Sequence, residues 1–182
     1  NDTRKGERID LAMFYLSDSK VIEALKEACA RGANARILLD PNKDAFGRNK
    51  NGIPNRAVAA DLVEWAAGKQ ADIQIRWFDT HGEQAHFKLL HVRDESARRG
   101  RMIIGSANFT PRNLRGRNLE SAFYIEDSGG VTRQCSFVFD RLWENKLANF
   151  SVPYDEYAST GLKLKLQKLL TAFGNATGFC TW

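Results

Sequence analysis

The chain has 182 residues and a formal net charge of +5, from 27 Lys plus Arg against 22 Asp plus Glu. Its 43% hydrophobic and 27% charged residues are typical of a globular protein and exclude a disordered or collagen-like chain. No apolar run approaches the ~20 residues that span a bilayer, and the length fits a single domain, which we expect to cover residues 1–182.

The first half of the chain predicts two βαβ units. In order, the expected elements are a strand at residues 9–16, a helix that Ser17 or Asp18 caps and Gly32 ends, a strand at 35–39, a loop at 40–55, a helix that has Pro54 in its first turn and ends at Gly68, and a strand at 73–78. Consecutive strands joined by a helix run parallel with a right-handed crossover. We therefore expect three parallel strands in this half.

The second half predicts a hairpin, one more strand and two helices. The expected elements are strands at 87–92 and 102–104 joined by an extended turn at 93–101, a strand at 119–125, and helices at 131–147 and 162–170. The Lys/Leu pattern of the last helix fits either a packed amphipathic helix or one that lies on a membrane surface. We favour the packed helix.

The positive charge is concentrated in one segment. Residues 86–118 contain eight basic and two acidic residues, a local sum of +6, whereas the rest of the chain sums to −1. This distribution indicates a local anionic partner such as a phosphate, a nucleic acid or a lipid headgroup, with a solvated Arg-rich loop as the alternative. The three cysteines are odd in number and lack CxxC spacing, so they indicate neither a disulfide scaffold nor a zinc site.

Two short motifs in this segment carry side chains suited to phosphate chemistry. His86 and Lys88 are two residues apart on an expected strand, so both side chains share one face and Phe87 turns toward the core. A GSAN sequence that contains Ser106 and Asn108 directly follows the next strand. If the two strands are neighbours, all four polar side chains lie at a common end.

In this order, the two motifs resemble the HxKxxxxD and GSxN pattern of the phospholipase D superfamily. The opening βαβ pattern also resembles the start of one repeat of that family, so the resemblance covers most of the chain. It implies an α/β fold with a mixed, mostly parallel sheet flanked by helices on both faces. The motif Asp is expected where this chain has Arg93. Asp94 is the next residue and takes that structural role if the strand contains a bulge.

The resemblance also implies a mechanism without metal or cofactor. A neutral imidazole, here His86, attacks a phosphodiester to form a phosphohistidine, while a second His acts as general acid and base; which of these two roles belongs to His86 stays open. Lys88, Ser106 and Asn108 hold the nonbridging oxygens of the phosphate. Glu120 resembles the family's downstream glutamate, which orients the catalytic imidazole.

The chain contains a single HxK motif, and its other two histidines do not supply the second catalytic His. His91 is expected on the opposite strand face from His86, and His81 in a turn. We therefore expect the second motif to come from another repeat of the same protein or from a homodimer mate. Because the chain starts without Met or a signal-peptide core, we favour the C-terminal repeat of a two-repeat enzyme.

The expected substrate is a phospholipid, as in phospholipase D or cardiolipin synthase, with possible peripheral membrane contact. A nuclease acting on DNA or RNA is the alternative, because the arginines of the basic segment also suit a nucleic-acid backbone. A third alternative is a catalytically silent repeat that only binds phosphate. Asn-x-Ser/Thr sequons occur at Asn108, Asn149 and Asn175, and a glycan on Asn108 would block the site, which favours a non-glycosylating source such as a bacterium.

Overall fold

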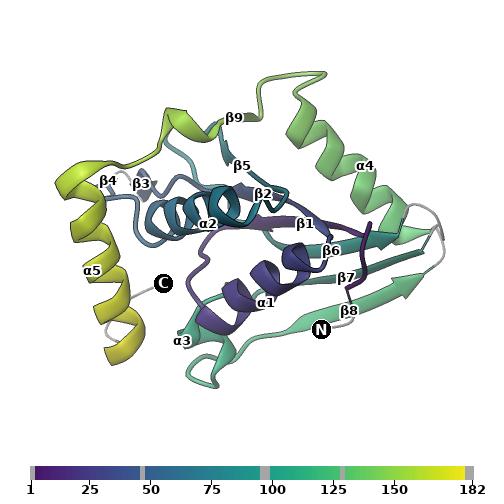
Figure 1. Cartoon of the computed structure of the whole chain (residues 1–182), viewed down its shortest axis with the longest axis horizontal. Coiled ribbons are helices and arrows are strands. Elements are labelled where there is room, and N and C mark those ends of the chain that lie inside the picture. The colour runs from purple at the N-terminus through teal and green to yellow at the C-terminus, as the bar shows by residue number, and fades with distance from the viewer. Residues whose placement is uncertain (1–2, 46–47, 95–98, 128–129, 179–182) are drawn as a thin grey trace.

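The computed structural model describes residues 3–45, 48–94, 99–127 and 130–178, and its centre is a seven-stranded sheet in the order β8-β7-β6-β1-β2-β5-β9 (Figure 1). The strands are β1 (Arg8–Met13), β2 (Asn34–Leu39), β5 (Ile73–Phe78), β6 (Lys88–Asp94), β7 (Arg99–Gly105), β8 (Ala122–Asp127) and β9 (Ser151–Pro153), with β3 (Asp44–Ala45) and β4 (Arg48–Asn49) as a separate pair. The helices are α1 (Ser19–Ala30), α2 (Asn55–Lys69), α3 (Pro111–Leu114), α4 (Val131–Glu144) and α5 (Gly161–Thr177), and a 3₁₀ turn spans Tyr154–Glu156.

The α/β fold with a mixed sheet is confirmed, but the parallel part is smaller than expected. Only β1–β2 and β2–β5 pair in parallel, as the two βαβ units predict. The remaining four pairings are antiparallel. The reason is that no helix separates β6 from β7, or β5 from β6, and strands joined without a crossover helix can run in opposite directions.

Helices cover both faces of the sheet, as expected, because the side chains of β1 alternate between two cores (Figure 1). Ile9, Leu11 and Met13 lie in the core beneath α1 and α2. Ala12 lies in the second core with Phe139 of α4. The α1 N-terminus is capped by a side chain, also as expected, because Asp18 accepts hydrogen bonds from two backbone N–H groups of the first turn.

The last helix packs against α2, but most of its leucines face solvent. Gln167 and Thr171 of α5 are buried, whereas Leu162, Leu166 and Leu169 are exposed. The expected packed amphipathic helix therefore has its polar side inward. Within the described residues, no helix is long and apolar enough to cross a bilayer.

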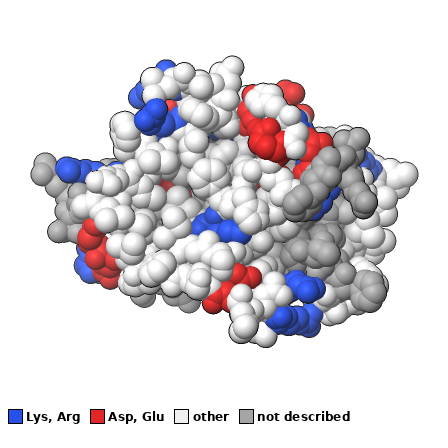
Figure 2. Space-filling view, turned by 180° about the vertical axis from the view of Figure 1, so that it is seen from behind, with Lys and Arg blue, Asp and Glu red and all other residues white. Residues whose placement is uncertain are grey.

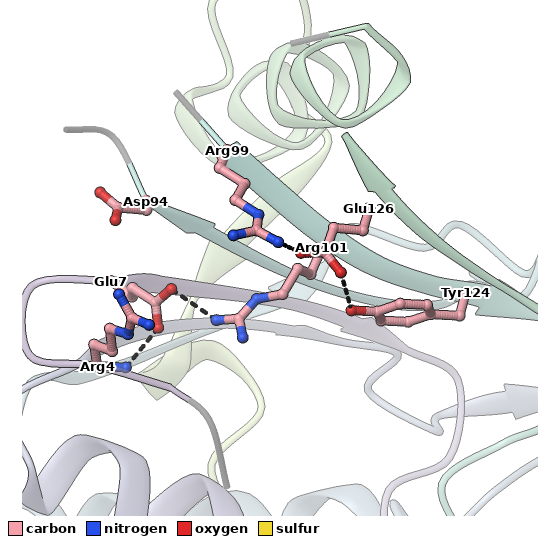
Figure 3. A pocket seen from close by; sticks show the side chains of 7 residues that line it. All are labelled: Arg4, Glu7, Asp94, Arg99, Arg101, Tyr124 and Glu126. Atoms are coloured by element: carbon pink, nitrogen blue, oxygen red, sulfur yellow. Dashed lines mark hydrogen bonds and ion pairs between the residues drawn. The ribbon is translucent and has the colours of Figure 1, made fainter. Parts of the chain in front are cut away.

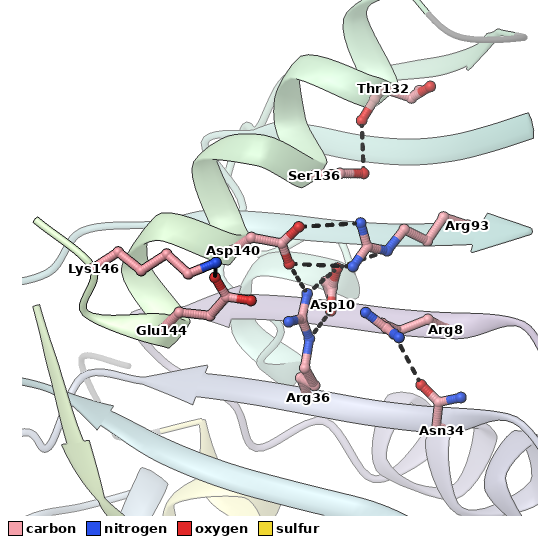
Figure 4. Close-up of polar contacts among 10 residues, drawn as sticks. All are labelled: Arg8, Asp10, Asn34, Arg36, Arg93, Thr132, Ser136, Asp140, Glu144 and Lys146. Carbon is pink, nitrogen blue, oxygen red and sulfur yellow. Dashed lines mark hydrogen bonds and ion pairs between the residues drawn. The ribbon is translucent and has the colours of Figure 1, made fainter. Parts of the chain in front are cut away.

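Four charged side chains are joined beneath α4 (Figure 4). Arg36 of β2 donates to Asp10 of β1 (2.7 Å) and to Asp140 of α4 (2.7 Å). Arg93 of β6 lies 3.2 Å from Asp140 and 3.5 Å from Asp10. Asp10 is fully buried, so its charge is compensated by the two guanidinium groups alone rather than by water. This cluster ties three strands to the helix.

A buried amide network joins the carboxyl ends of β1 and β2 to the start of α2. The fully buried Asn55 side chain donates to the carbonyls of Phe14 (2.7 Å) and Asp40 (2.8 Å) and accepts from the N–H of Leu16 (2.8 Å). Asn42 donates to the same Phe14 carbonyl (3.1 Å) and to the Asp40 carboxylate (3.1 Å). Three irregular segments thereby satisfy one another's backbone groups without water.

The charge cluster predicts that Asp, the residue expected at position 93 from the motif resemblance, is not tolerated there. Arg93→Asp removes one of two cations and adds a third carboxylate beside Asp10 and Asp140, which should lower the free energy of unfolding by roughly 3–5 kcal/mol. Arg99→Asp, on the exposed end of the same hairpin, should change it by no more than about 1 kcal/mol. Urea denaturation measures both, and an Arg93→Asp protein as stable as wild type would contradict the assigned role of the cluster.

The amide network predicts that truncation of the Asn55 side chain lowers the free energy of unfolding. Asn55→Ala removes the bonds to the buried Asp40 carbonyl and Leu16 N–H and one of the two bonds to the Phe14 carbonyl, and it should lower the free energy of unfolding by roughly 3 kcal/mol. Asn34→Ala is the matched control, because Asn34 accepts a single 3.3 Å bond from Arg8, and it should cost less than about 1 kcal/mol. If the two variants lost the same free energy of unfolding in urea denaturation, the network would not be what stabilises these segments.

Candidate active site

The segment that follows β1 brings the HxK and GSxN motifs together. The Phe14 N–H donates to the carbonyl of Phe87 (2.8 Å), within the HxK motif. One residue on, Tyr15 donates its N–H to the Asn108 side chain (3.3 Å) and accepts from the N–H of Phe109 (3.1 Å). Both motifs are therefore fixed by main-chain bonds to neighbouring residues of one segment.

His86 and Lys88 lie against the same aromatic ring. The His86 and Phe14 ring centroids are 4.7 Å apart, and the Lys88 Nζ lies 5.1 Å from the Phe14 centroid. Lys88 is 8% exposed, whereas His86, which precedes the start of β6, is open to solvent. Phe87 does not enter the core as expected. It is 39% exposed, because it stacks on Phe78 at 4.9 Å near the edge of the second core.

Burial lowers the pKa values of both motif side chains, His86 and Lys88. It lowers the pKa of Lys88 to about 8, although the nearby carboxylates of Glu120 and Asp40 act in the opposite direction. Burial and the adjacent Lys88 charge also lower the pKa of His86. At neutral pH the site thus presents a neutral imidazole, the form that can act as a nucleophile or base, beside an ammonium group.

Ser106 and Glu120 are in direct contact, and Asn113 completes the group. The Ser106 hydroxyl donates to one oxygen of Glu120 (2.5 Å), and the Asn113 amide donates to the other. These bonds lower the pKa of Glu120. Within the described residues, no hydrogen bond joins Glu120 to the His86 ring, so here the carboxylate orients Ser106 instead. Asn113 carries no motif signal and was not expected at the site.

Asp94 lies at the other end of β6 from these residues, in a pocket that Figure 3 shows from close by. Six steps of ~3.3 Å along the strand place it about 20 Å from Lys88. The β6–β7 register runs unbroken from Leu89–Ile104 to Asp94–Arg99, so the expected bulge is not present. The pocket there has a volume of about 330 Å³ and is lined by Arg4, Glu7, Asp94, Arg99, Arg101, Tyr124 and Glu126. Arg93, at the position of the motif Asp, belongs to the charge cluster.

The other two histidines are where the sequence predicts them. His91 is fully buried on the opposite face of β6, beneath α4, and His81 is exposed in a turn. Across the ranges that the structure describes, no three His, Cys, Asp or Glu side chains gather in a way that could hold a metal ion.

Most arginines of the basic segment already have acidic partners. Besides Arg93, these are Arg99 with Glu126, Arg101 with Glu7 (2.7 Å), and Arg115 with Asp18 (3.1 Å). Figure 2 shows small separate groups of basic and acidic residues on a largely uncharged face rather than one continuous basic surface. The turn at 95–98, including Arg98, lies outside the described residues.

The sequence matches one known family of proteins. Residues 3–143 match the family model described as "Cardiolipin synthase, PLD-like domain". No curated protein matches the sequence.

Solved structures show the same fold at low sequence identity. Nuc from Salmonella typhimurium, a phospholipase D family member, is 19% identical over 78% of this chain and 81% of its own, with a TM-score of 0.56. NucT from Helicobacter pylori is 13% identical over 80% and 81%, with a TM-score of 0.54. Phosphatidylserine synthase from Haemophilus influenzae is 13% identical over 96% of this chain but 40% of its own, with a TM-score of 0.56. Since the family match covers most of the sequence and the fold agrees, the chain belongs to the phospholipase D superfamily.

Proposed function

We propose that this domain cleaves or transfers at a phosphodiester through His86, with a phospholipid as substrate. The observation that carries the proposal is the pair formed on the Phe14 ring: an open imidazole whose pKa is lowered, next to the ammonium of Lys88. An imidazole must be unprotonated to attack phosphorus, and a cation stabilises the charge on the phosphate oxygens; the pair offers both at neutral pH.

The reaction proceeds in two displacements. A ring nitrogen of His86 attacks phosphorus, and the bond from phosphorus to the leaving alkoxide breaks as a second His donates a proton to that oxygen. Water or an alcohol then attacks the phosphohistidine, gives its proton to the second His and releases His86. Lys88, Ser106 and Asn108 bind the nonbridging oxygens. The second His comes from another repeat of the same protein or from a homodimer mate.

The ion pairs of the basic segment favour a lipid over a nucleic acid. A protein that follows a nucleic-acid backbone needs several cations free to replace counterions along the strand. Here Arg93, Arg99, Arg101 and Arg115 are engaged with carboxylates of the same domain. The single phosphodiester of a lipid needs only the local cation that Lys88 supplies.

Removal of the imidazole tests both chemistry and substrate. In the full-length protein, His86→Ala should lower turnover of a phospholipid panel by roughly 10²-fold or more, because no other histidine of this domain can replace it. His81→Ala removes an exposed imidazole that pairs with Asp79 and Glu83 and is not part of either motif, so it is the matched control, with no expected change.

Full activity of the His86→Ala protein would contradict catalysis by this domain and leave it as a silent, phosphate-binding repeat. Cleavage of single-stranded DNA with no turnover of lipid would contradict the substrate class instead.

The lowered pKa values predict a bell-shaped pH profile on a water-soluble phosphodiester. The rate should rise as His86 loses its proton, below the usual imidazole range, and fall above pH about 8 as Lys88 loses its charge. Lys88→Arg keeps the cation at all these pH values, so its slower reaction should lack the fall near pH 8. A fall that is unchanged in Lys88→Arg would mean that another group causes it.

A further inference from the structure

Helix α5 presents an apolar stripe to solvent. Leu162, Leu166, Leu169 and Phe173 follow one another at steps of four, three and four residues, so they share one face of the helix, and they are 54–82% exposed. Leu170 lies at the edge of the same stripe. Four adjacent large apolar side chains on one helix indicate an interaction surface rather than scattered surface residues.

The opposite side of α5 is fixed by polar contacts, so the helix cannot simply roll over. The buried Gln167 amide donates to the Asn51 carbonyl. Asn175 donates to the Ser17 carbonyl (2.9 Å), and Lys168 pairs with Asp61 of α2 (2.5 Å). Turning the leucines inward would break all three contacts and expose Gln167.

The stripe lies at the end of the domain that carries the candidate site. Asn51 directly follows Lys50, whose ammonium contacts the Tyr15 hydroxyl, and Ser17 lies two residues after Tyr15. Tyr15 is the residue whose backbone holds the GSxN motif. Figure 1 shows α5 beyond this end of the sheet, on the left.

The charges of α5 identify what covers the stripe. The helix contains three lysines and no acidic residue. At about 100° per residue, Lys163 and Lys165 fall on the two borders of the stripe, one on each side. Lysines in these positions can extend toward phosphate groups while the apolar side chains enter the acyl boundary. A partner protein would not require cations on both borders.

We propose that α5 docks the domain on an anionic lipid surface, with its leucine stripe inserted and its axis parallel to the membrane plane. At ~1.5 Å per residue, the stripe from Leu162 to Phe173 gives a contact about 17 Å long. This contact sets the site end of the domain at the level of the headgroups. The use of this binding for catalysis rests on the proposed function, whereas the binding itself does not.

Vesicle co-sedimentation of the full-length protein tests this docking. Wild type should bind vesicles of phosphatidylcholine mixed with phosphatidylglycerol more tightly than vesicles of phosphatidylcholine alone. Leu169→Glu should weaken that binding about tenfold or more, because it places a carboxylate among the inserted side chains. Leu147→Glu is the matched control, since Leu147 is 67% exposed against 66% for Leu169 but lies outside α5, and it should bind like wild type.

Equal vesicle binding by Leu169→Glu and wild type would overturn the proposal. It would also be overturned if the wild type did not bind vesicles but formed dimers in size-exclusion chromatography that were absent in Leu169→Glu. Two further measurements separate this proposal from the proposed function. His86→Ala should bind vesicles normally, and Leu169→Glu should hydrolyse a water-soluble phosphodiester normally. Loss of vesicle binding in Leu169→Glu, with no hydrolysis even by wild type, would reject the proposed function and support the docking helix.

Discussion

The buried hydrogen bonds of Asp40, Asn42 and Asn55 fix the segments that contact the HxK and GSxN motifs. Asn55 holds the segment after β1 through Phe14, and that segment in turn holds both motifs by main-chain bonds. The Asp40 carboxylate also accepts the N–H of Ala85 (2.8 Å), the residue before His86. Backbone groups of these segments thus help to position the site. Some of its own side chains take part as well, because Asn108 accepts from the Tyr15 N–H and Ser106 donates to Glu120. Polar groups buried without partners are costly, so these segments have few alternative arrangements.

The same packing sets the electrostatics of the site. Lys88 is buried because the Phe14 ring covers it, and burial lowers its pKa more than Glu120 and Asp40 raise it. Burial also raises the pKa of Asp40, although three hydrogen bonds and the charge of Lys50 oppose that change. The lowered pKa of Lys88 and the raised pKa of Asp40 are therefore both consequences of this packing.

The sequence predicts those features of the structure that depend on neighbouring residues, such as strand alternation and helix capping. Period-two alternation places His86 and Lys88 on one side and His91 on the other, and the polar residue Asp18 marks the start of α1. The partner of Glu120 could not be predicted, because it depends on how α3 presents Asn113. The role of Arg93 depends likewise on carboxylates from β1 and α4, which no spacing within its own motif reveals.

The orientation of α5 shows why an amphipathic pattern alone does not reveal which side of a helix packs. Periodicity identifies a leucine face, and the usual inference is that this face meets the core. Here Gln167, Lys168 and Asn175 meet complementary polar groups on the domain, and these contacts determine which side of the helix faces inward. Exposed leucines are unfavourable in water, and their arrangement on one side of the helix fits the lipid contact that we propose for it. A helix fixed in this way can carry a membrane contact without any change in the fold that holds the site.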